Sequence, residues 1–356
     1  MSDILILGYY GFKNSGDDAL LLSVIKELRK QKNDIKLTVL SNDPEETQKN
    51  YGVPAVKRYN IFSILKNIIT SKMLLVGGGT LIQDGTSTKS LMYYLFVIRL
   101  ALLLGKKVML YANGIGPLKK ENYNITKRIL NKVNVITLRE SMSAEELKNI
   151  GVTKPRTVIT ADSAFNLEFK VENKIPAQIE NDYVCVSVRN YRNMSEDFEN
   201  IIADTCNYIA KNYSCTPVLI PFQKTKDMGI CQRIKEKIKY KSILFDTDCS
   251  IEELFDLFSH ARMCIGMRLH SLIYASICTV PSVGIVYDPK IEGFMEYMGQ
   301  KRYVYAETLD SASFVKMVDE CFEKHEEIKT ELKINLNKMK KKAEENAHEA
   351  VRLLNE

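Results

Sequence analysis

The chain has 356 residues, of which 45% are apolar and 26% are charged. This balance excludes wholesale disorder, and the length exceeds what one hydrophobic core usually organises, so we expect two domains. The net charge of +6 is too small to indicate nucleic-acid binding, and no basic-aromatic recognition motif accompanies it. An anionic substrate, or a weakly basic face beside anionic lipid, fits this charge better.

The first half of the chain alternates short β-branched runs with longer helical patterns, which predicts a parallel, doubly wound α/β sheet. The N-terminus has no basic region before an apolar one, so we expect a first strand there and no secretory signal. The run 91–104 is broken by Arg99 and is shorter than the roughly 20 residues of a spanning helix, so a buried helix is favoured over an interfacial one. The expected strands are 4–7, 36–40, 73–76, 108–111 and 135–138, and the expected helices are 18–30, 91–104, 123–131 and 143–150.

A polar stretch at 168–181, which holds Pro176, interrupts this pattern and is interpreted as a linker. A second alternating unit follows it, and from residue 312 the chain is helical and strongly charged, which favours a solvated amphipathic helix. In this second unit the expected strands are 183–189, 217–221, 242–244, 263–265 and 280–285, and the expected helices are 197–211, 228–238, 251–259 and 271–277.

The eight cysteines are scattered, and neither a CxxC pair nor a cluster with zinc-ligand spacing occurs. Most lie in apolar runs, where a thiol behaves as a small buried hydrophobe. Free thiols without a disulfide framework predict a reducing, cytoplasmic environment. The sequence therefore gives no reason to expect a metal.

The segment 266–290, GMRLHSLIYASICTVPSVGIVYDPK, combines Arg268, His270 and Lys290 with an apolar βα pattern. Two fixed cations and one imidazole that titrates near neutrality can hold a phosphate and move a proton. Arg268 and His270 would share a face if the segment were extended, and a helix from Ser271 would add free N–H groups. The alternative is that Arg268 pairs with a surface carboxylate and His270 is a satisfied core histidine.

Residues 8–18, GYYGFKNSGDD, follow the first expected strand and open the first expected helix. Gly11 would let the backbone approach a ligand, and Asp17 or Asp18 can cap the helix. Two acidic residues at a helix N-terminus disfavour phosphate, so a hydroxyl-bearing acceptor near Asn14 and Asp17 fits better. The pattern is neither GxGxxG nor a Walker loop, and a tight structural turn is the alternative.

Two more glycine-rich loops follow expected strands, VGGGTLIQD at 76–84 and YANGIGP at 111–117. Three consecutive glycines cost conformational entropy, so a close backbone approach is expected to compensate. The candidate sugar-binding residues here are Gly78, Gly79, Gln83, Asp84, Asn113 and Gly114. Beyond them, Arg139 follows a strand, where it either faces the cleft or pairs with Glu140.

Together, GYYGFKNSGDDALL, VGGGTLIQD, NGIGPL, LRE, ADSAF, GMRLHSLIYA and YDPK resemble the polysaccharide pyruvyl transferases, especially the CsaB-type bacterial enzymes of cell-wall polymer assembly. The resemblance spans residues 8–290 and implies a GT-B-like fold, two Rossmann-like doubly wound domains facing a cleft. It also implies that phosphoenolpyruvate donates a pyruvyl group to a sugar as a ketal. In CsaB-type enzymes that sugar is N-acetylmannosamine in a lipid-linked precursor of the secondary cell-wall polysaccharide that anchors S-layer proteins.

The same resemblance implies that Arg139, Arg268, His270 and Lys290 are the phosphoenolpyruvate-binding and catalytic residues. The three cations would hold the phosphate and carboxylate of the donor, and His270 would be the general acid. Asp17 or Asp84 is a candidate base, and the scheme needs no metal and no cofactor. We expect residues 1–170 to be the acceptor side, 180–311 the donor side, and 312–356 a set of charged helices.

Two other functions compete with this one: a nucleotide-sugar-dependent glycosyltransferase of the same fold, and a sugar- or phosphate-binding module without catalysis. If the acceptor is lipid-linked, we expect a cytoplasmic protein with peripheral contact at the inner face of the cell membrane. The basic tail and the 91–104 helix are candidate contacts, although a solvated tail and a buried helix are favoured. The sequence leaves the acceptor sugar, the ketal stereochemistry and the oligomeric state open.

Overall fold

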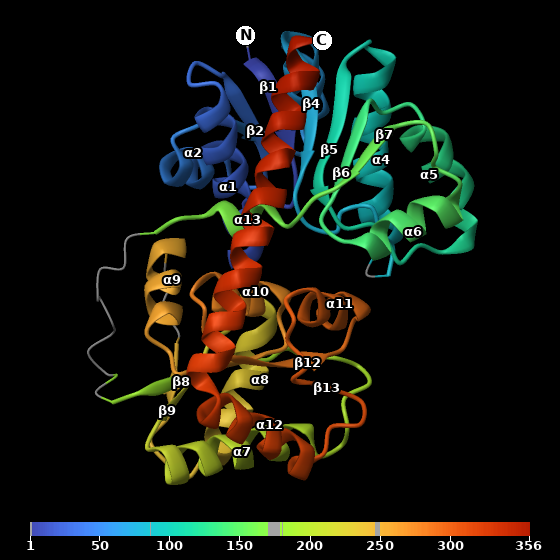
Figure 1. Cartoon of the computed structure of the whole chain (residues 1–356). Helices are drawn as coiled ribbons and strands as arrows, with labels where there is room; N and C mark the ends of the chain where they lie inside the picture. The colour runs from blue at the N-terminus through green and yellow to red at the C-terminus, as the bar shows by residue number, and fades with distance from the viewer. Residues whose placement is uncertain (1, 86, 170–178, 180, 246–249) are drawn as a thin grey trace. The chain divides into compact units, whose positions relative to one another are not determined.

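The computed structural model describes residues 2–85, 87–169, 179, 181–245 and 250–356, and the chain divides into two compact units (Figure 1). Unit 1 comprises Met1–Leu167 and Met339–Glu356, and unit 2 comprises Glu168–Lys338. Most of the expected linker at 168–181, including Pro176, lies outside the described residues.

Unit 1 is built on a seven-stranded parallel sheet with the order β3-β2-β1-β4-β5-β6-β7. The order reverses between β1 and β4, which pair in register from Ser2 with Ser71 to Leu7 with Val76. Loops that follow two such strands flank the crevice where doubly wound sheets bind ligands. The strands are β1 (Ser2–Leu7), β2 (Leu37–Ser41), β3 (Ala55–Lys57), β4 (Ser71–Gly77), β5 (Lys107–Asn113), β6 (Val135–Leu138) and β7 (Arg156–Ile159).

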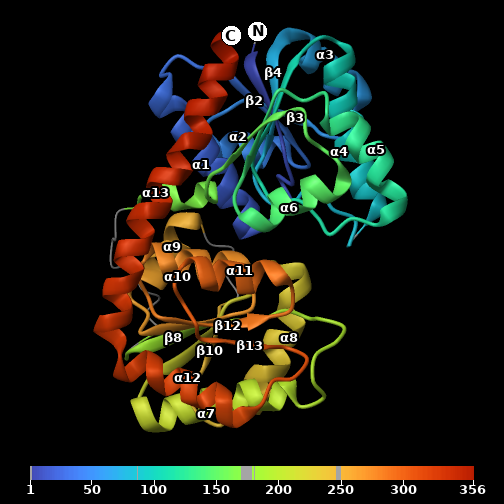
Figure 2. The ribbon, with the colours of Figure 1, turned by 45° about the vertical axis from the view of Figure 1, so that its right-hand side comes forward.

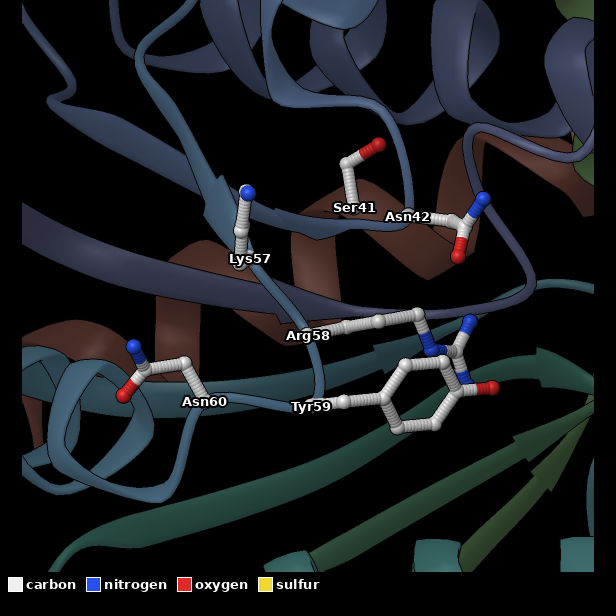
Figure 3. Close-up of a pocket in the computed structure, with 6 residues that line it drawn as sticks. All are labelled: Ser41, Asn42, Lys57, Arg58, Tyr59 and Asn60. Atoms are coloured by element: carbon white, nitrogen blue, oxygen red, sulfur yellow. The ribbon is translucent and has the colours of Figure 1, made fainter.

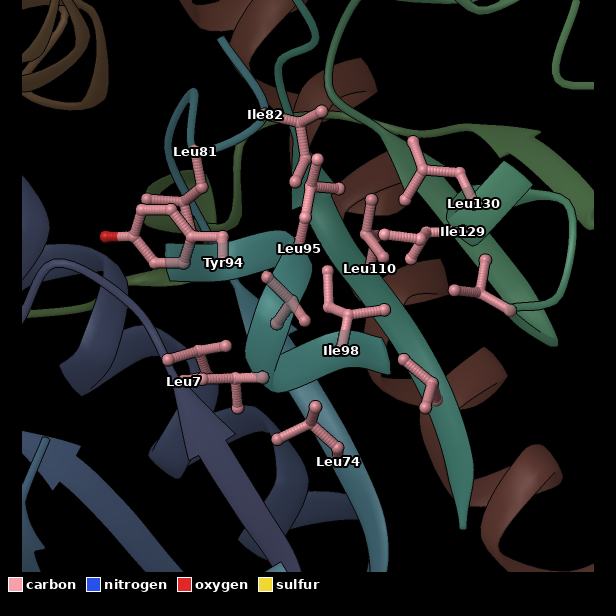
Figure 4. Close-up of a cluster of buried hydrophobic side chains, with 14 of the residues drawn as sticks. Leu7, Leu74, Leu81, Ile82, Tyr94, Leu95, Ile98, Leu110, Ile129 and Leu130 are labelled. Atoms are coloured by element: carbon pink, nitrogen blue, oxygen red, sulfur yellow. The ribbon is translucent and has the colours of Figure 1, made fainter. Parts of the chain in front are cut away.

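Two apolar layers hold this sheet. On one face, strand residues such as Leu7 and Leu110 pack against Tyr94 and Ile98 of α4 (Figure 4). On the other face, α1 packs together with Ala347 from the end of the chain. The helices of the unit are α1 (Ser15–Gln31), α2 (Pro44–Tyr51), α3 (Ile61–Thr70), α4 (Thr88–Leu103), α5 (Tyr123–Leu130) and α6 (Ser141–Ile150), with 3₁₀ turns at Lys120–Asn122 and Ser163–Asn166.

The first helix begins earlier than the sequence predicted. Asn14 is its N-cap, and the Asn14 side chain accepts a hydrogen bond from the Gly16 N–H at 3.2 Å. Asp17 and Asp18 therefore lie inside the first turn, where carboxylates favour the helix dipole, and neither caps the helix. The prediction that one of these aspartates is the cap was wrong.

Unit 2 repeats the architecture with six parallel strands in the order β10-β9-β8-β11-β12-β13, which reverses between β8 and β11. The strands are β8 (Tyr183–Ser187), β9 (Thr216–Leu219), β10 (Ile243–Leu244), β11 (Met263–Gly266), β12 (Ser282–Val286) and β13 (Tyr303–Tyr305). The helices are α7 (Phe198–Tyr213), α8 (Lys224–Lys237), α9 (Ile251–Ser259), α10 (Leu269–Ile277), α11 (Pro289–Tyr297) and α12 (Ser311–Glu323).

The charged tail forms one long helix, α13 (His325–Asn355), that contributes to both units. Its first part buries Ile328 and Leu332, and Asn335 donates from Nδ2 to the Met298 carbonyl at 3.0 Å. Its second part belongs to unit 1, where Asn346 donates to the Ala161 carbonyl at 3.1 Å. The tail is thus helical as expected, and its apolar side is buried in the two units.

The seven described cysteines are free thiols, and six of them are buried. None of the helices within the described ranges is both long enough and apolar enough to cross a bilayer.

Candidate functional site

Three cationic side chains follow three adjacent strands of the second sheet. Arg189 lies two residues beyond β8, Arg268 two residues beyond β11, and Lys290 four residues beyond β12. Neighbouring parallel strands end at the same edge of a sheet, so all three belong to the carboxyl edge of unit 2. The order reverses between β8 and β11, so Arg189 and Arg268 flank the switch point.

Arg268 is held by a buried carboxylate. Its Nε donates to Asp227 Oδ2 at 3.0 Å, and its Nη2 donates to Asp227 Oδ1. Asp227 is fully buried in the first turn of α8, and it also accepts from the Gln223 N–H at 2.9 Å. A bidentate pair fixes the guanidinium plane, so an incoming anion would meet Arg268 on its Nη1 side. The sequence offered pairing of Arg268 with a surface carboxylate as an alternative; in the structure Arg268 does pair with a carboxylate, but that of the buried Asp227.

His270 lies in the first turn of α10, which begins at Leu269 with Arg268 as the N-cap residue. The extended segment on which Arg268 and His270 would share a face is therefore absent, and the helix starts two residues before the expected position. The imidazole is half-buried and lies 6.5 Å, centroid to centroid, from the Tyr274 ring one turn later. Because His270 lies at the N-terminal end of α10, which follows β11, it belongs to the carboxyl edge of the sheet.

Lys290 belongs to a compact group centred on Tyr287. Lys290 Nζ donates to Asp288 Oδ2 at 2.9 Å and lies 5.6 Å from the centroid of the Tyr287 ring. Arg189 Nη1 donates to the Tyr287 hydroxyl at 2.9 Å, and its guanidinium carbon is 4.7 Å from the same ring. Two cations thus share one aromatic ring, and only Lys290 has a carboxylate partner in this group. We expect such a group to attract a multiply charged anion.

Sequence reasoning missed Arg189 because it fell inside the expected strand 183–189, which in the structure ends at Ser187. An arginine at the carboxyl end of the first strand of a doubly wound unit was the available signal. It also missed α11, although Asp288 as N-cap and Pro289 at the first position are strong helix-start signals.

Arg139, by contrast, is buried in unit 1 and surrounded by partners. Its Nε donates to Glu140 at 2.8 Å, its Nη1 to Asp162 at 3.0 Å, and its Nη2 to the Thr80 hydroxyl at 3.0 Å. Burial opposes its charge, but the Glu140 and Asp162 carboxylates raise the Arg139 pKa above its ordinary value. The sequence left two alternatives open for Arg139, a position facing the cleft or a pairing with Glu140, and in the structure Arg139 pairs with Glu140. Arg139 therefore ties the β6 end to the second glycine loop through Thr80.

The polar groups of three predicted sugar-binding residues form hydrogen bonds within the chain itself. Asp84 is buried and accepts from the Lys119 N–H at 2.8 Å and from Asn122 Nδ2 at 2.5 Å. Asn113 is also buried and donates to the Val76 and Tyr111 carbonyls, at 2.8 and 2.9 Å. Gly114 donates to the Gly79 carbonyl at 3.0 Å, which joins the second and third glycine loops directly. In this conformation these groups fix loops and do not present themselves to a ligand.

The glycines of the first two loops also accommodate neighbouring parts of the same chain. Gly11 has a φ of +76°, and a Cβ there would lie 2.3 Å from the Ser41 hydroxyl. Gly78 has a φ of +60°, and a Cβ there would lie 2.9 Å from Leu20. The close approach predicted for the glycines is therefore to side chains of unit 1. Gln83 follows the second loop as a half-buried side chain.

Asp17 is the acidic group that remains half-buried at the first switch point. A Cβ at Gly79 would lie 3.4 Å from Asp17 Oδ1, so this carboxylate lies against the second glycine loop. It therefore stands between the loops that follow β1 and β4. Asn14, the N-cap of the same helix, lies one turn before it.

A pocket of about 470 Å³ opens at the ends of β2 and β3 (Figure 3). Arg58 forms its base: it is 2% exposed and donates from Nη1 to the Gly8 carbonyl at 2.6 Å. Tyr59 is 64% exposed. This pocket was not predicted from the sequence, because the strand before it is only three residues long. The lining residues are Ser41, Asn42, Lys57, Arg58, Tyr59 and Asn60.

Within the described part of the chain, no group of three or more His, Cys, Asp or Glu side chains is arranged to hold a metal ion. The chemistry that the described groups can supply is anion binding by Arg189, Arg268 and Lys290, proton transfer by His270, and proton acceptance by Asp17.

The chain was compared with known proteins and solved structures. The chain is 24% identical over 395 residues to the amylovoran biosynthesis protein AmsJ of Erwinia amylovora, covering 92% of this chain and 94% of that protein.

Among solved structures, Anabaena Alr3699/HepE in complex with UDP and glucose superposes with a TM-score of 0.65, 12% identity and full coverage of both chains. The S. aureus MnaA–UDP structure gives a TM-score of 0.66 at 13% identity, covering 100% of this chain and 98% of that chain. The UDP-GlcNAc 2-epimerase of Neisseria meningitidis gives 0.66 at 13% identity over 99% of both chains. These similarities confirm the predicted GT-B-like fold with two Rossmann-like units.

The profile of one family matches residues 14–289, a span that holds the second and third glycine loops of unit 1 together with Arg189, Arg268 and His270 of unit 2. The chain belongs to the polysaccharide pyruvyl transferase family.

Proposed function

We propose that the protein uses phosphoenolpyruvate to build a 4,6-pyruvate ketal on a saccharide of a lipid-linked polysaccharide precursor, with N-acetylmannosamine as the acceptor sugar. Family membership supports a pyruvyl transfer role, and the similarity to a polysaccharide biosynthesis protein supports a saccharide acceptor. The observation that carries the donor assignment is the cationic carboxyl edge of unit 2. Arg189, Arg268 and Lys290 follow three adjacent strands there, and a donor with a phosphate and a carboxylate needs several cations.

The reaction balances without a further reactant. His270 donates a proton to the methylene carbon of phosphoenolpyruvate, which becomes the methyl group and leaves cationic character at the central carbon. One acceptor hydroxyl adds to that carbon and loses its proton, the C–O bond to phosphate breaks, and the second hydroxyl adds and loses its proton. The two hydroxyl protons replace the one given by His270 and protonate the departing phosphate. Asp17 is the proposed base for the first hydroxyl.

We assign the donor to unit 2 and the acceptor to unit 1, where the pocket at Lys57–Asn60 offers polar side chains and the exposed Tyr59 ring to a sugar. In this scheme Arg139 is a positioning residue, because its guanidinium nitrogens already bind Glu140, Asp162 and Thr80. In this proposal the reaction takes place at the cytoplasmic face of the membrane that carries the acceptor.

The test is phosphate release from phosphoenolpyruvate with a panel of synthetic lipid-linked saccharides. The expected product has the acceptor mass plus pyruvate less one water. Acceptors that lack either the O4 or the O6 hydroxyl should give no ketal. Release of UDP from a UDP-sugar, with no phosphate released from phosphoenolpyruvate, would instead establish the nucleotide-sugar glycosyltransferase.

Residue variants test the donor site itself. Arg189→Gln and Lys290→Gln should each raise the KM for phosphoenolpyruvate by about tenfold or more, since each removes one cation from the anion site. Arg192→Gln and Lys301→Gln are matched controls, because both side chains are exposed cations of the same unit. Equal effects of the two pairs would reject the assignment.

A further inference from the structure

The outer surface of α3 and α4 carries an unusual share of the exposed apolar side chains of unit 1. Large hydrophobic residues are normally exposed singly, whereas here they gather on two neighbouring helices. Phe62 is 81% exposed and Leu103 is 72% exposed. We name this surface the α3–α4 face, and its exposed apolar members are Tyr59, Ile61, Phe62, Ile69, Phe96, Leu103 and Leu104.

The two helices form one continuous surface. They pack against each other on the same side of the first sheet, as Figure 2 shows. Lys106 Nζ donates to the Ile69 carbonyl at 2.7 Å, which joins the ends of the two helices. At their other ends, the Tyr59 and Tyr93 rings lie 5.3 Å apart. The exposed residues therefore belong to a single face.

The α3–α4 face is also strongly cationic. The stretch from residue 57 to residue 107 holds eight lysines and arginines and a single carboxylate, Asp84; of the eight cations, Arg58 is buried and Lys72 pairs with Asp3 at 2.8 Å. The Asp84 carboxylate is buried and bonded inside unit 1, so it does not offset the surface charge. Lys57, Lys66, Lys89 and Arg99 are exposed among or beside the apolar side chains.

Sequence periodicity shows that the cations and apolar groups alternate on the same stripe. On α4 the exposed positions are Lys89, Phe96, Arg99 and Leu103, which recur at helical spacing, while Tyr94 and Ile98 face the core. Aromatic and aliphatic side chains interspersed with lysine and arginine are the chemistry of helices that lie in a membrane interface. A second copy of this face would be repelled by the like charge, which argues against self-association.

We propose that the α3–α4 face docks the protein on an anionic lipid surface, with the apolar side chains entering the headgroup region and the cations meeting lipid phosphates. None of the described helices needs to cross the bilayer in this arrangement. The docking is independent of the pyruvyl transfer reaction, because it needs neither donor nor acceptor. The pocket at Lys57–Asn60 adjoins this face and shares Tyr59 with it, so a lipid-borne sugar would meet the pocket first.

Vesicle co-sedimentation of the full chain tests the proposal without any substrate. The protein should bind vesicles of phosphatidylcholine with one-third phosphatidylglycerol, should bind phosphatidylcholine alone much more weakly, and should be released by added salt. Phe62→Asp with Leu103→Asp should abolish binding. Lys66→Glu with Arg99→Glu should weaken binding by about thirtyfold or more, as expected for the loss of two interfacial cations.

Controls change exposed residues elsewhere in unit 1: Met142→Asp, at a side chain that is 43% exposed, for the apolar variant, and Lys132→Glu with Lys148→Glu for the charge variant. Circular dichroism and thermal melting establish that all variants fold. Absence of binding to anionic vesicles, or equal losses in the control variants, would overturn the proposal. So would a dimer in sedimentation velocity that the Phe62→Asp and Leu103→Asp changes disperse, since the face would then join two copies of the chain.

Discussion

The carboxyl edges of the two sheets have the same topology but use their polar side chains in opposite ways. At the edge of unit 1, Arg139, Asp84 and Asn113 are buried and bonded to their own chain. At the edge of unit 2, Arg189 and Lys290 are half-buried around one tyrosine.

The difference shows that a polar residue after a strand has two distinct uses. When a strand end is covered by glycine-rich loops, the polar groups satisfy the loop backbone, and burial makes that mandatory. When a helix begins shortly after the strand, as α10 and α11 do, side chains such as His270 and Lys290 remain half-buried at the edge. We therefore expect substitutions of the buried, bonded residues Arg139, Asp84 and Asn113 to act on stability, and those of His270, Arg189 and Lys290 to act on turnover or donor binding.

The largest effect is expected for His270→Ala. Loss of the general acid should lower kcat about 10²- to 10⁴-fold, while the melting temperature stays close to that of the parent protein. Phosphate release under saturating donor measures it, and His348→Ala, which removes an exposed imidazole from α13, is the control. Ketal formation at a near-normal rate would remove His270 from the mechanism.

Arg139→Ala should destabilise the fold by about 3–5 kcal/mol, because it leaves the buried Asp162 without its cation. Urea unfolding measures the free energy. The milder Arg139→Lys variant should keep the affinity for phosphoenolpyruvate in a titration. If that affinity falls tenfold while stability is kept, Arg139 contacts the donor and the contrast between the two edges fails.

Arg268→Lys should affect both properties, since Arg268 binds Asp227 and faces the proposed anion. A lysine cannot make the bidentate contact, so we expect about a tenfold loss of affinity for phosphoenolpyruvate and about 1–2 kcal/mol of stability. Calorimetric titration and urea unfolding give the two numbers. An unchanged donor affinity would show that Arg268 only supports α8.

Asp84→Asn should cost about 1–3 kcal/mol of stability, because the carboxylate accepts from Lys119 and Asn122 in a buried site. Its kcat should change less than about threefold, since a buried, bonded carboxylate does not reach a substrate. Stability comes from urea unfolding and kcat from phosphate release. A collapse of kcat in a stable variant would make Asp84 the base in place of Asp17.

The smallest effect concerns the pH dependence of stability. Burial raises the pKa of Asp18 from 3.8 to about 7. Between these two pH values the folded protein keeps a proton on Asp18 that the unfolded chain has lost. The contribution of this protonated carboxyl to the free energy of unfolding is fully present below pH 3.8 and is lost as the pH rises through about 7. Asp18→Asn should be the more stable form at pH 8 by about 1 kcal/mol or more and should show a flatter profile. The exposed Asp34 supplies the control Asp34→Asn, and parallel profiles of Asp18→Asn and parent protein would contradict the shift.

The sequence by itself determined the doubly wound class and most of the elements, because strands buried on both faces and long helices leave strong periodic signals. It also determined the family, because its motifs recur in order along residues 8–290. Short elements such as β3 and α2 were not predicted, because a segment of three to eight residues carries too little periodicity.

Tertiary structure decided which of the polar residues are available. Asp84, Asn113 and Arg139 looked like ligand groups because each follows a strand, yet loops that are distant in sequence bury and bond them. Arg189 became a candidate only when β8 was found beside β11 and Tyr287 was found beneath its guanidinium. Local periodicity fixes an element, whereas the partners of a polar side chain come from segments that only the folded chain brings together.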